Sequence, residues 1–397
     1  MMAFHLLTFA LSAASAVGAP ATPDSAVTPC WTGSAPAARV RVDSARREFT
    51  VTVGPFDIAP MPPGTRMVMG GGHADHQHMD HGDMSHGDMD HGDMDHGSMG
   101  AMDHEGSETP LMCFDWPVSA WARGFRIEVR DKTGAALPRE MLHHVTVVNF
   151  NRRQLVYPVL ERLMGAGKET DDVMLPRQIA VPMSAGQRLG MWAAWHNESG
   201  APVEGAVIRL TITWAPVGRH SGPLGVLPLY LDVNDADLFG AYDIPPGRST
   251  KSFDFRLPTG GRLLGAGGHL HDYAVAVRLE DAATGKTIVR LRSERDSAGR
   301  ILSVSRKRFI FRPRRLRADH PYRLVAEYDN PTGQPLARAA MAQMIAIFAP
   351  DDLSRWAAVD PNDPAIRREL DGLAEMNRGA AAPRAQESAS QGEHEHH

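Results

Sequence analysis

Short runs of alternating apolar and polar residues fill most of the chain after residue 110. Examples are FRIEVRD, HHVTVVNF and AVIRLTITWAPV, and Gly, Pro and Asn lie between the runs. Because successive side chains of a strand point to opposite faces, this pattern predicts many short, half-buried strands. Their spacing is typical of β-sandwiches. We therefore predict an all-β fold with two tandem antiparallel β-sandwich domains of jelly-roll-like form.

A Gly-rich stretch, VGRHSGPLGV, divides the strand-like runs into two groups. For a chain of 397 residues two domains are expected. We place an N-terminal sandwich at 37–216 and a C-terminal sandwich at 225–350. Residues 351–397 are predicted to hold a short helix and a disordered tail. The helix starts near Asp363-Pro364 and carries Ile366, Leu370 and Leu373 at helical spacing.

The N-terminus is a short apolar stretch that ends in small residues, which is typical of a signal peptide over residues 1–21. The alternative is a buried N-terminal helix. A signal peptide implies a secreted or periplasmic protein. In such a protein Cys30 and Cys113, the only two cysteines, could form a disulfide. They could equally be two unrelated residues.

The net charge of −5 is close to neutral for this length and argues against a large nucleic-acid interface. After the N-terminus, no apolar run is long enough to predict a membrane span.

Residues 62–108 interrupt the first domain with a low-complexity insertion built on the repeat HGDM(S/D). Almost nothing in it can enter a core, so it is predicted to be disordered. Imidazole binds several transition metals and thioether selects Cu(I), so the composition favours copper. The alternative is a solvated, charge-balanced spacer. The predicted accessory ligands are His81, His86, His91, His96, Met84, Met89 and Met94.

The stretch LLGAGGHLHDYAVAVRL carries two histidines at positions i and i+2, His269 and His271. On a strand both point to the same face, so both can reach one metal ion. Gly265, Gly267 and Gly268 are expected to leave room for a close approach. The alternative is a surface strand with two ordinary histidines.

Three further histidines lie at strand ends, and one methionine lies in the last strand. His143 and His144 are adjacent, so they can share an ion only if the backbone is irregular there. His196 ends the run LGMWAAWH, and Met341 opens the final run MAQMIAIFAP. Taken alone, the histidine pair could have one ring packed inward, and Met341 could be core.

The order of these elements over roughly residues 37–350 resembles the copper type II, ascorbate-dependent monooxygenases. This is the family of peptidylglycine α-hydroxylating monooxygenase and dopamine β-hydroxylase. The resemblance implies two copper ions that face each other across a solvent-filled cleft, with ascorbate as reductant, O₂, and C–H hydroxylation of a small substrate. It implies one copper on His143, His144 and His196, and a second on His269, His271 and Met341, the last three being catalytic.

The residues that bind the peptide substrate in that family are replaced here by Gly267, Gln343 and Ile345. The substrate is therefore a different small molecule, and the resemblance identifies a distant bacterial-type member. The alternative function is a non-catalytic copper-binding protein for resistance, storage or delivery, with a possible copper-delivery partner. A third possibility is a purely structural double sandwich.

Overall fold

The computed structural model describes residues 38–61, 109–167, 172–218, 222–234, 240–356 and 358–381. The predicted signal peptide, the accessory ligands of residues 62–108 and the tail after residue 381 lie outside these ranges and stay predictions. Cys113 is disulfide-bonded, while Cys30 lies outside the described residues. Within those ranges, no helix has both the length and the apolar character needed to cross a membrane.

Strands β1 to β11 form two sheets. Sheet I has the order β1-β2-β10-β4-β8-β11, with β7 paired to β4. Its strands are β1 (Arg39–Asp43), β2 (Glu48–Ile58), β4 (Ala120–Arg130), β7 (Val173–Met174), β8 (Ile179–Met183), β10 (Val203–Pro216) and β11 (Leu224–Gly225). Sheet II has the order β3-β9-β5-β6. Its strands are β3 (Met112–Asp115), β5 (Leu142–Arg153), β6 (Leu160–Gly167) and β9 (Arg188–Trp195), and the short 3-10 helix η1 (Arg139–Met141) precedes β5.

The later strands form two five-stranded sheets and a two-stranded ribbon. Sheet III has the order β12-β23-β15, with β19 and β20 both paired to β15. It contains β12 (Leu227–Asp232), β15 (Gly261–Leu270), β19 (Lys307–Arg308), β20 (Arg314–Leu316) and β23 (Ala342–Pro350). Sheet IV has the order β14-β21-β16-β17-β18. It contains β14 (Gly247–Phe255), β16 (Ala274–Asp281), β17 (Lys286–Arg295), β18 (Ile301–Val304) and β21 (Tyr322–Asn330). The ribbon pairs β13 (Tyr242–Ile244) with β22 (Leu336–Ala340), and the 3-10 helix η2 (Leu353–Arg355) follows β23.

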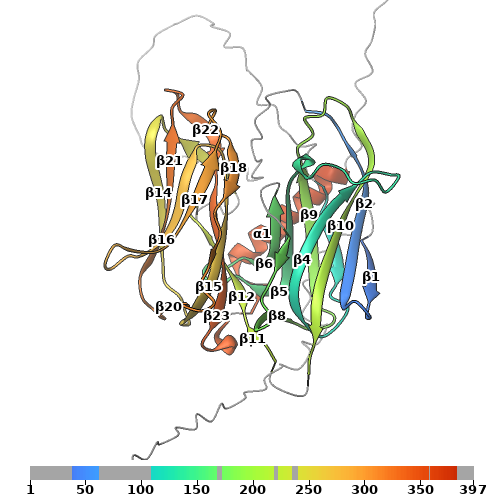
Figure 1. Cartoon of the computed structure of the whole chain (residues 1–397), viewed down its shortest axis with the longest axis horizontal. Helices are drawn as coiled ribbons and strands as arrows, with labels where there is room; N and C mark the ends of the chain where they lie inside the picture. The colour runs from blue at the N-terminus through green and yellow to red at the C-terminus, as the bar shows by residue number, and fades with distance from the viewer. Residues whose placement is uncertain are drawn as a thin grey trace, which may run out of the picture.

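The four sheets stand in a row, I, II, III and IV, from right to left in Figure 1. One apolar cluster fills the space between sheets I and II, where the Phe49 and Trp116 rings meet edge to face with centroids 4.7 Å apart. A second cluster fills the space between sheets III and IV. These clusters are two sandwich cores, so the predicted all-β sandwich fold is confirmed. The connection between β5 and β6 meets sheet III where Tyr157 and Val159 pack on Tyr230 of β12.

The single described helix, α1 (Pro364–Ala381), returns to the first sandwich and covers the outer face of sheet II (Figure 1). The carboxylate of Asp363 caps it by accepting from the Ala365 backbone N–H at 2.8 Å. Ile366 and Leu373 then pack against residues of sheet II, as their helical spacing predicts. The short C-terminal helix is therefore confirmed.

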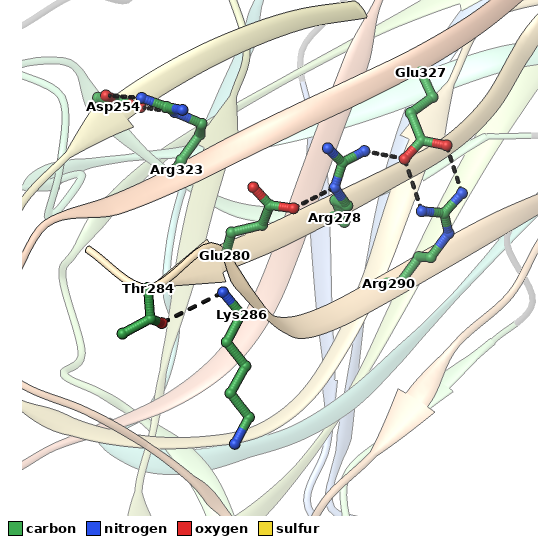
Figure 2. Close-up of polar contacts among 8 residues, drawn as sticks. All are labelled: Asp254, Arg278, Glu280, Thr284, Lys286, Arg290, Arg323 and Glu327. Atoms are coloured by element: carbon green, nitrogen blue, oxygen red, sulfur yellow. Dashed lines mark hydrogen bonds and ion pairs between the residues drawn. The ribbon is translucent and has the colours of Figure 1, made fainter. Parts of the chain in front are cut away.

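The outer face of sheet IV faces solvent and carries several ion pairs. Figure 2 shows that Arg278 and Arg290 both contact the carboxylate of Glu327, while Arg323 pairs with Asp254. Charged side chains on neighbouring strands that pair in this way suit an exposed sheet face. The row of four sheets therefore ends at sheet IV.

Candidate functional site

The first two histidines lie at the start of β5, where the strand is irregular. The pairing of β5 with β9 shifts register between Leu142 and His144. Leu142 and Val145 both enter the first core, and the two residues between them are half-buried with ring centroids 5.1 Å apart. A bulge of this kind allows His143 and His144 to leave the core side together. The irregular backbone predicted from the sequence is present.

His196 follows the last residue of β9, and its backbone N–H donates to the Met141 carbonyl at 2.8 Å. Its ring centroid lies 6.4 Å from that of His143. Nε2 lies 2.8 Å from the Glu198 carboxylate, so this nitrogen carries the proton and donates it. Nδ1 is buried and has no hydrogen-bond partner among the described residues. A carboxylate that holds one ring nitrogen while the other is left as a lone pair is the usual arrangement of a metal-ligating histidine.

His269 and His271 lie at the end of β15, with ring centroids 5.1 Å apart. The pairing of β15 with β23 continues through the His271 backbone N–H, which donates to the Met341 carbonyl at 3.1 Å. Residues directly opposite in an antiparallel pair share a face, so Met341 lies on the side of His271. Met341 is only 3% exposed, yet it belongs to none of the apolar clusters of the described residues, whereas its neighbours Ala340 and Ala342 do.

The two groups of histidines meet between sheets II and III. The His143 ring centroid is 6.4 Å from that of His269 and 5.9 Å from that of His271. An imidazole nitrogen binds a metal at about 2.0–2.1 Å, which places the ring centroid about 3.2 Å from the ion. Two rings on one tetrahedral ion would then have centroids about 5.2 Å apart, and only two rings on opposite sides of an ion would have centroids about 6.4 Å apart. The pairs His143–His144 and His269–His271, each at 5.1 Å, lie close to the tetrahedral value. The separation of 5.9 Å from His143 to His271 is intermediate, and the separations of 6.4 Å from His143 to His196 and to His269 equal the upper limit.

The ring atoms, in contrast, do not form a ligand set. Among the described residues, no three His, Cys, Asp or Glu side chains are arranged to hold one ion. The His ring torsion χ2 is broad, and rotation about it turns the nitrogens while leaving the centroid almost in place. The centroid positions are therefore the better guide to what the cluster can bind. Pairs of imidazoles in the cluster lie close enough to share an ion, but no three of the described side chains are arranged to hold one.

Burial sets the protonation of the cluster. Desolvation, together with the nearby charges of His269 and His271, lowers the pKa of His144 to about 3. His144 is therefore neutral at neutral pH, which is the form of imidazole that binds metals.

A buried acid behind His269 went unnoticed in the sequence. Asp232 of β12 is opposite Gln343 of β23, which is opposite His269 of β15, so the three side chains form a row across sheet III. The Asp232 carboxylate accepts from the Gln343 amide at 3.1 Å and from the Tyr230 hydroxyl at 3.0 Å. Burial raises the pKa of Asp232 to about 6. The available signal was an Asp at the end of the otherwise apolar run LPLYL.

The glycines before the His-x-His pair leave room for the neighbouring strands and not for the imidazoles. A Cβ on Gly268 would lie 2.9 Å from the Gln343 carbonyl, and one on Gly265 would lie 3.1 Å from the Lys307 carbonyl. A Cβ on Gly267 would meet nothing closer than 3.9 Å. The expected close approach is therefore made by the strands on either side of β15.

Comparisons with known proteins were made at three levels. No family model matches the chain, and no curated protein matches it. Among solved structures, the major capsid protein P2 of bacteriophage PM2 matches with a TM-score of 0.34 at 10% identity, over 61% of this chain and 93% of that one. The major capsid protein of Sulfolobus turreted icosahedral virus matches with a TM-score of 0.32 at 10% identity, over 60% and 91%. A likeness of this size does not extend to a shared function.

These findings contradict the copper monooxygenase resemblance. The matched structures are capsid proteins and include no copper monooxygenase among those reported. That family also requires two coppers separated by a solvent-filled cleft, whereas here His143 lies within 6.4 Å of the rings of the other sandwich. The expected hydroxylating enzyme is therefore wrong, and the catalytic roles predicted for His269, His271 and Met341 are not carried further. The alternative of a copper resistance, storage or delivery protein has no support either.

Proposed function

We propose that this chain is a structural two-sandwich protein whose interface is closed by one or two transition-metal ions bound to the histidine cluster. His143 and His144 lie in β5 and His196 directly follows β9, both strands of sheet II, while His269 lies in β15 of sheet III and His271 directly follows it. An ion shared between the two groups would hold the sandwiches together, because its ligands come from both of them. This role needs neither a substrate nor a reductant.

The observation that carries the proposal is the environment of His196. Its Nε2 is held by Glu198, and its buried Nδ1 lacks a hydrogen-bond partner among the described residues. A buried polar atom left in this state costs free energy unless a ligand satisfies it. A metal ion beside His196 and His143 supplies that ligand and uses the carboxylate as its outer support.

The donor types narrow the choice of metal. Imidazole suits Zn²⁺, Cu²⁺ and Ni²⁺, and a thioether at Met341 adds a preference for Cu(I). Copper, expected from the sequence, therefore stays a proposal and is the first ion to test, followed by zinc. Ascorbate was expected only as the co-substrate of the enzyme and is not carried further.

The test is metal-dependent thermal stability of the full chain. An ion held only by the folded state, at a free concentration about 100 times its Kd, stabilises by about 2.7 kcal/mol. The repeat of residues 62–108 is predicted from the sequence to be disordered, so ions bound there are expected to bind folded and unfolded chains alike and to give little stabilisation. We expect a clear rise in Tm with copper or zinc.

The matched pair of variants is His143→Ala and His320→Ala. The His143 ring centroid lies within 6.4 Å of rings in both groups, whereas His320 contacts Asp281 and Arg317 on the second sandwich. The rise in Tm is lost in His143→Ala and kept in His320→Ala. A rise that survives in His143→Ala, or no rise with either copper or zinc, contradicts the proposal.

A further inference from the structure

The segment 306–317, RKRFIFRPRRLR, is the most basic part of the described chain. Seven of its twelve residues are Lys or Arg and none is Asp or Glu, although the whole chain carries a net charge of −5. All seven basic side chains are exposed. The positive charge is therefore concentrated on one small surface and faces solvent.

This segment is a protruding turn on the edge of sheet III. β19 and β20 pair with the same strand, β15, at Gly265–Ala266 and at Gly261–Leu263 respectively, so the residues between them bulge from the sheet. The Arg312 backbone N–H donates to the Phe309 carbonyl at 3.0 Å and closes the turn. The Phe309 backbone N–H donates to the Leu264 carbonyl at 2.7 Å, which fixes the base of the turn to β15.

The two residues at the tip point in opposite directions. Ile310 packs on the apolar cluster that contains Leu175, Ile179 and Leu264, so it anchors the turn to both sandwiches. Phe311 is 98% exposed. Phe309 is covered by the guanidinium of Arg314, 5.3 Å from its ring centroid. The turn therefore presents one uncovered aromatic ring on a rigid base.

The basic residues around Phe311 are only partly neutralised. Arg315 makes a bidentate pair with Asp351, and Arg317 contacts His320. Lys307, Arg308 and Arg312 make no ion pair with any acidic side chain of the described residues. On the outer face of sheet IV, in contrast, Arg278, Arg290 and Arg323 all have carboxylate partners.

We propose that this turn docks on an anionic lipid surface, with Phe311 inserted at the headgroup level and the basic side chains on the headgroups. Clustered Lys and Arg are attracted to anionic lipids, and an aromatic ring among them enters the interface. A single-stranded nucleic acid is a poorer fit, because such binding uses a groove with several stacking aromatics, whereas Phe311 stands alone on a convex turn. The proposal is independent of metal binding, because the histidines lie at the opposite end of β15.

The experiment is co-sedimentation of the full chain with vesicles of phosphatidylcholine alone and of equal parts phosphatidylcholine and phosphatidylserine. The test variants are Phe311→Ser and the triple change Lys307→Gln, Arg308→Gln, Arg312→Gln. Leu302→Ser is the control for an exposed apolar residue, since Leu302 is 57% exposed. The triple change Arg248→Gln, Lys286→Gln, Arg292→Gln is the control for charge, because it removes the same net charge from exposed residues elsewhere.

We expect binding to the anionic vesicles at least about tenfold stronger than to the neutral ones at low salt, and weakened by added salt. The loop triple change lowers this binding at least about tenfold and Phe311→Ser lowers it several-fold, because each removes one of the two attractions. Both controls bind like the wild type, and circular dichroism verifies that all variants are folded. Equal binding to both vesicles, or equal losses in the test and control triple changes, overturns the proposal. So does loop-dependent binding of an oligonucleotide without binding of vesicles.

Discussion

The outer face of sheet II makes two contacts that differ in how their polar groups are satisfied. At one end, α1 buries Glu369 against Arg162, and the same carboxylate accepts from the Leu160 backbone N–H at 2.7 Å. Nearby, the Asn377 amide pairs with the backbone of Leu111. At the other end lie the histidines, where the buried Nδ1 of His196 has no hydrogen-bond partner among the described residues.

This difference separates a contact that needs no ligand from one that favours a bound ion. The helix contact is complete without any ligand, because the chain supplies both donors and acceptors. The histidine contact gathers five groups that favour a metal, and it holds one of them with a carboxylate while its inner nitrogen points into a buried space. The same sheet thus carries one contact closed by the protein and one that we propose is closed by an ion.

The largest expected effect is the loss of the helix contact in Glu369→Ala. Removing one partner of a buried ion pair leaves a buried, uncompensated charge, which costs about 3–5 kcal/mol. Urea denaturation measures the change in free energy of unfolding. The exposed Glu375→Ala on the same helix is the control and stays within about 0.5 kcal/mol. Replacing both partners, by Arg162→Met with Glu369→Leu, restores most of the lost stability, and no restoration contradicts this account of the contact.

A smaller effect is expected where β15 positions His269. Gly268→Ala places a Cβ 2.9 Å from the Gln343 carbonyl and 3.2 Å from Leu291, so β15 must shift, at a cost of about 1–3 kcal/mol. Gly267→Ala is the matched control, because the nearest atom to its Cβ is 3.9 Å away. Thermal denaturation with and without metal measures both the stability and the metal-dependent gain. Equal losses in the two variants would show that crowding at β15 is not the cause.

Removing the carboxylate that orients His196 is expected to lower the affinity for the metal without a change in fold stability. Glu198→Gln keeps the size of the side chain but replaces the carboxylate that orients the imidazole, and such changes lower metal affinity about 10–100-fold. Isothermal titration with zinc and copper measures this change. Glu204→Gln, an exposed residue paired with Lys132, is the control. An unchanged metal affinity in Glu198→Gln contradicts the role proposed for Glu198 in orienting His196.

The smallest effect is expected on the paired surface of sheet IV. Arg323 lowers the pKa of Asp254 through a side-chain hydrogen bond and its charge. Both side chains are about half exposed, so Asp254→Asn costs less than about 0.5 kcal/mol at neutral pH. Because the folded-state pKa is lowered, this contribution is present above the unfolded pKa and is lost as the pH falls through the folded pKa. Urea denaturation at pH 7 and in acid measures this, and a cost that grows in acid contradicts it.

The sequence was sufficient for local features whose causes are local. Alternating runs predicted the strands, Ile366, Leu370 and Leu373 predicted α1, and the adjacent His143 and His144 predicted an irregular strand start. These follow from side-chain periodicity and backbone geometry within a few residues.

The sequence could not predict which residues far apart in the chain come together in the fold. The approach of His143 to His271 joins residues far apart in the chain and depends on how sheets II and III pack. The return of α1 to sheet II and the burial of Asp232 depend on the same packing. The family resemblance implied two separate copper sites, whereas the structure brings the histidines of both into one cluster.

The most direct test is a crystal structure of the full chain loaded with copper or zinc, with anomalous scattering recorded at the absorption edge of the metal. The account predicts an anomalous peak between sheets II and III, about 2 Å from ring nitrogens of both groups, with His196 Nδ1 among the ligands. A peak bound by the histidines of one sandwich only, or metal found in the crystal but absent from this cluster, contradicts it.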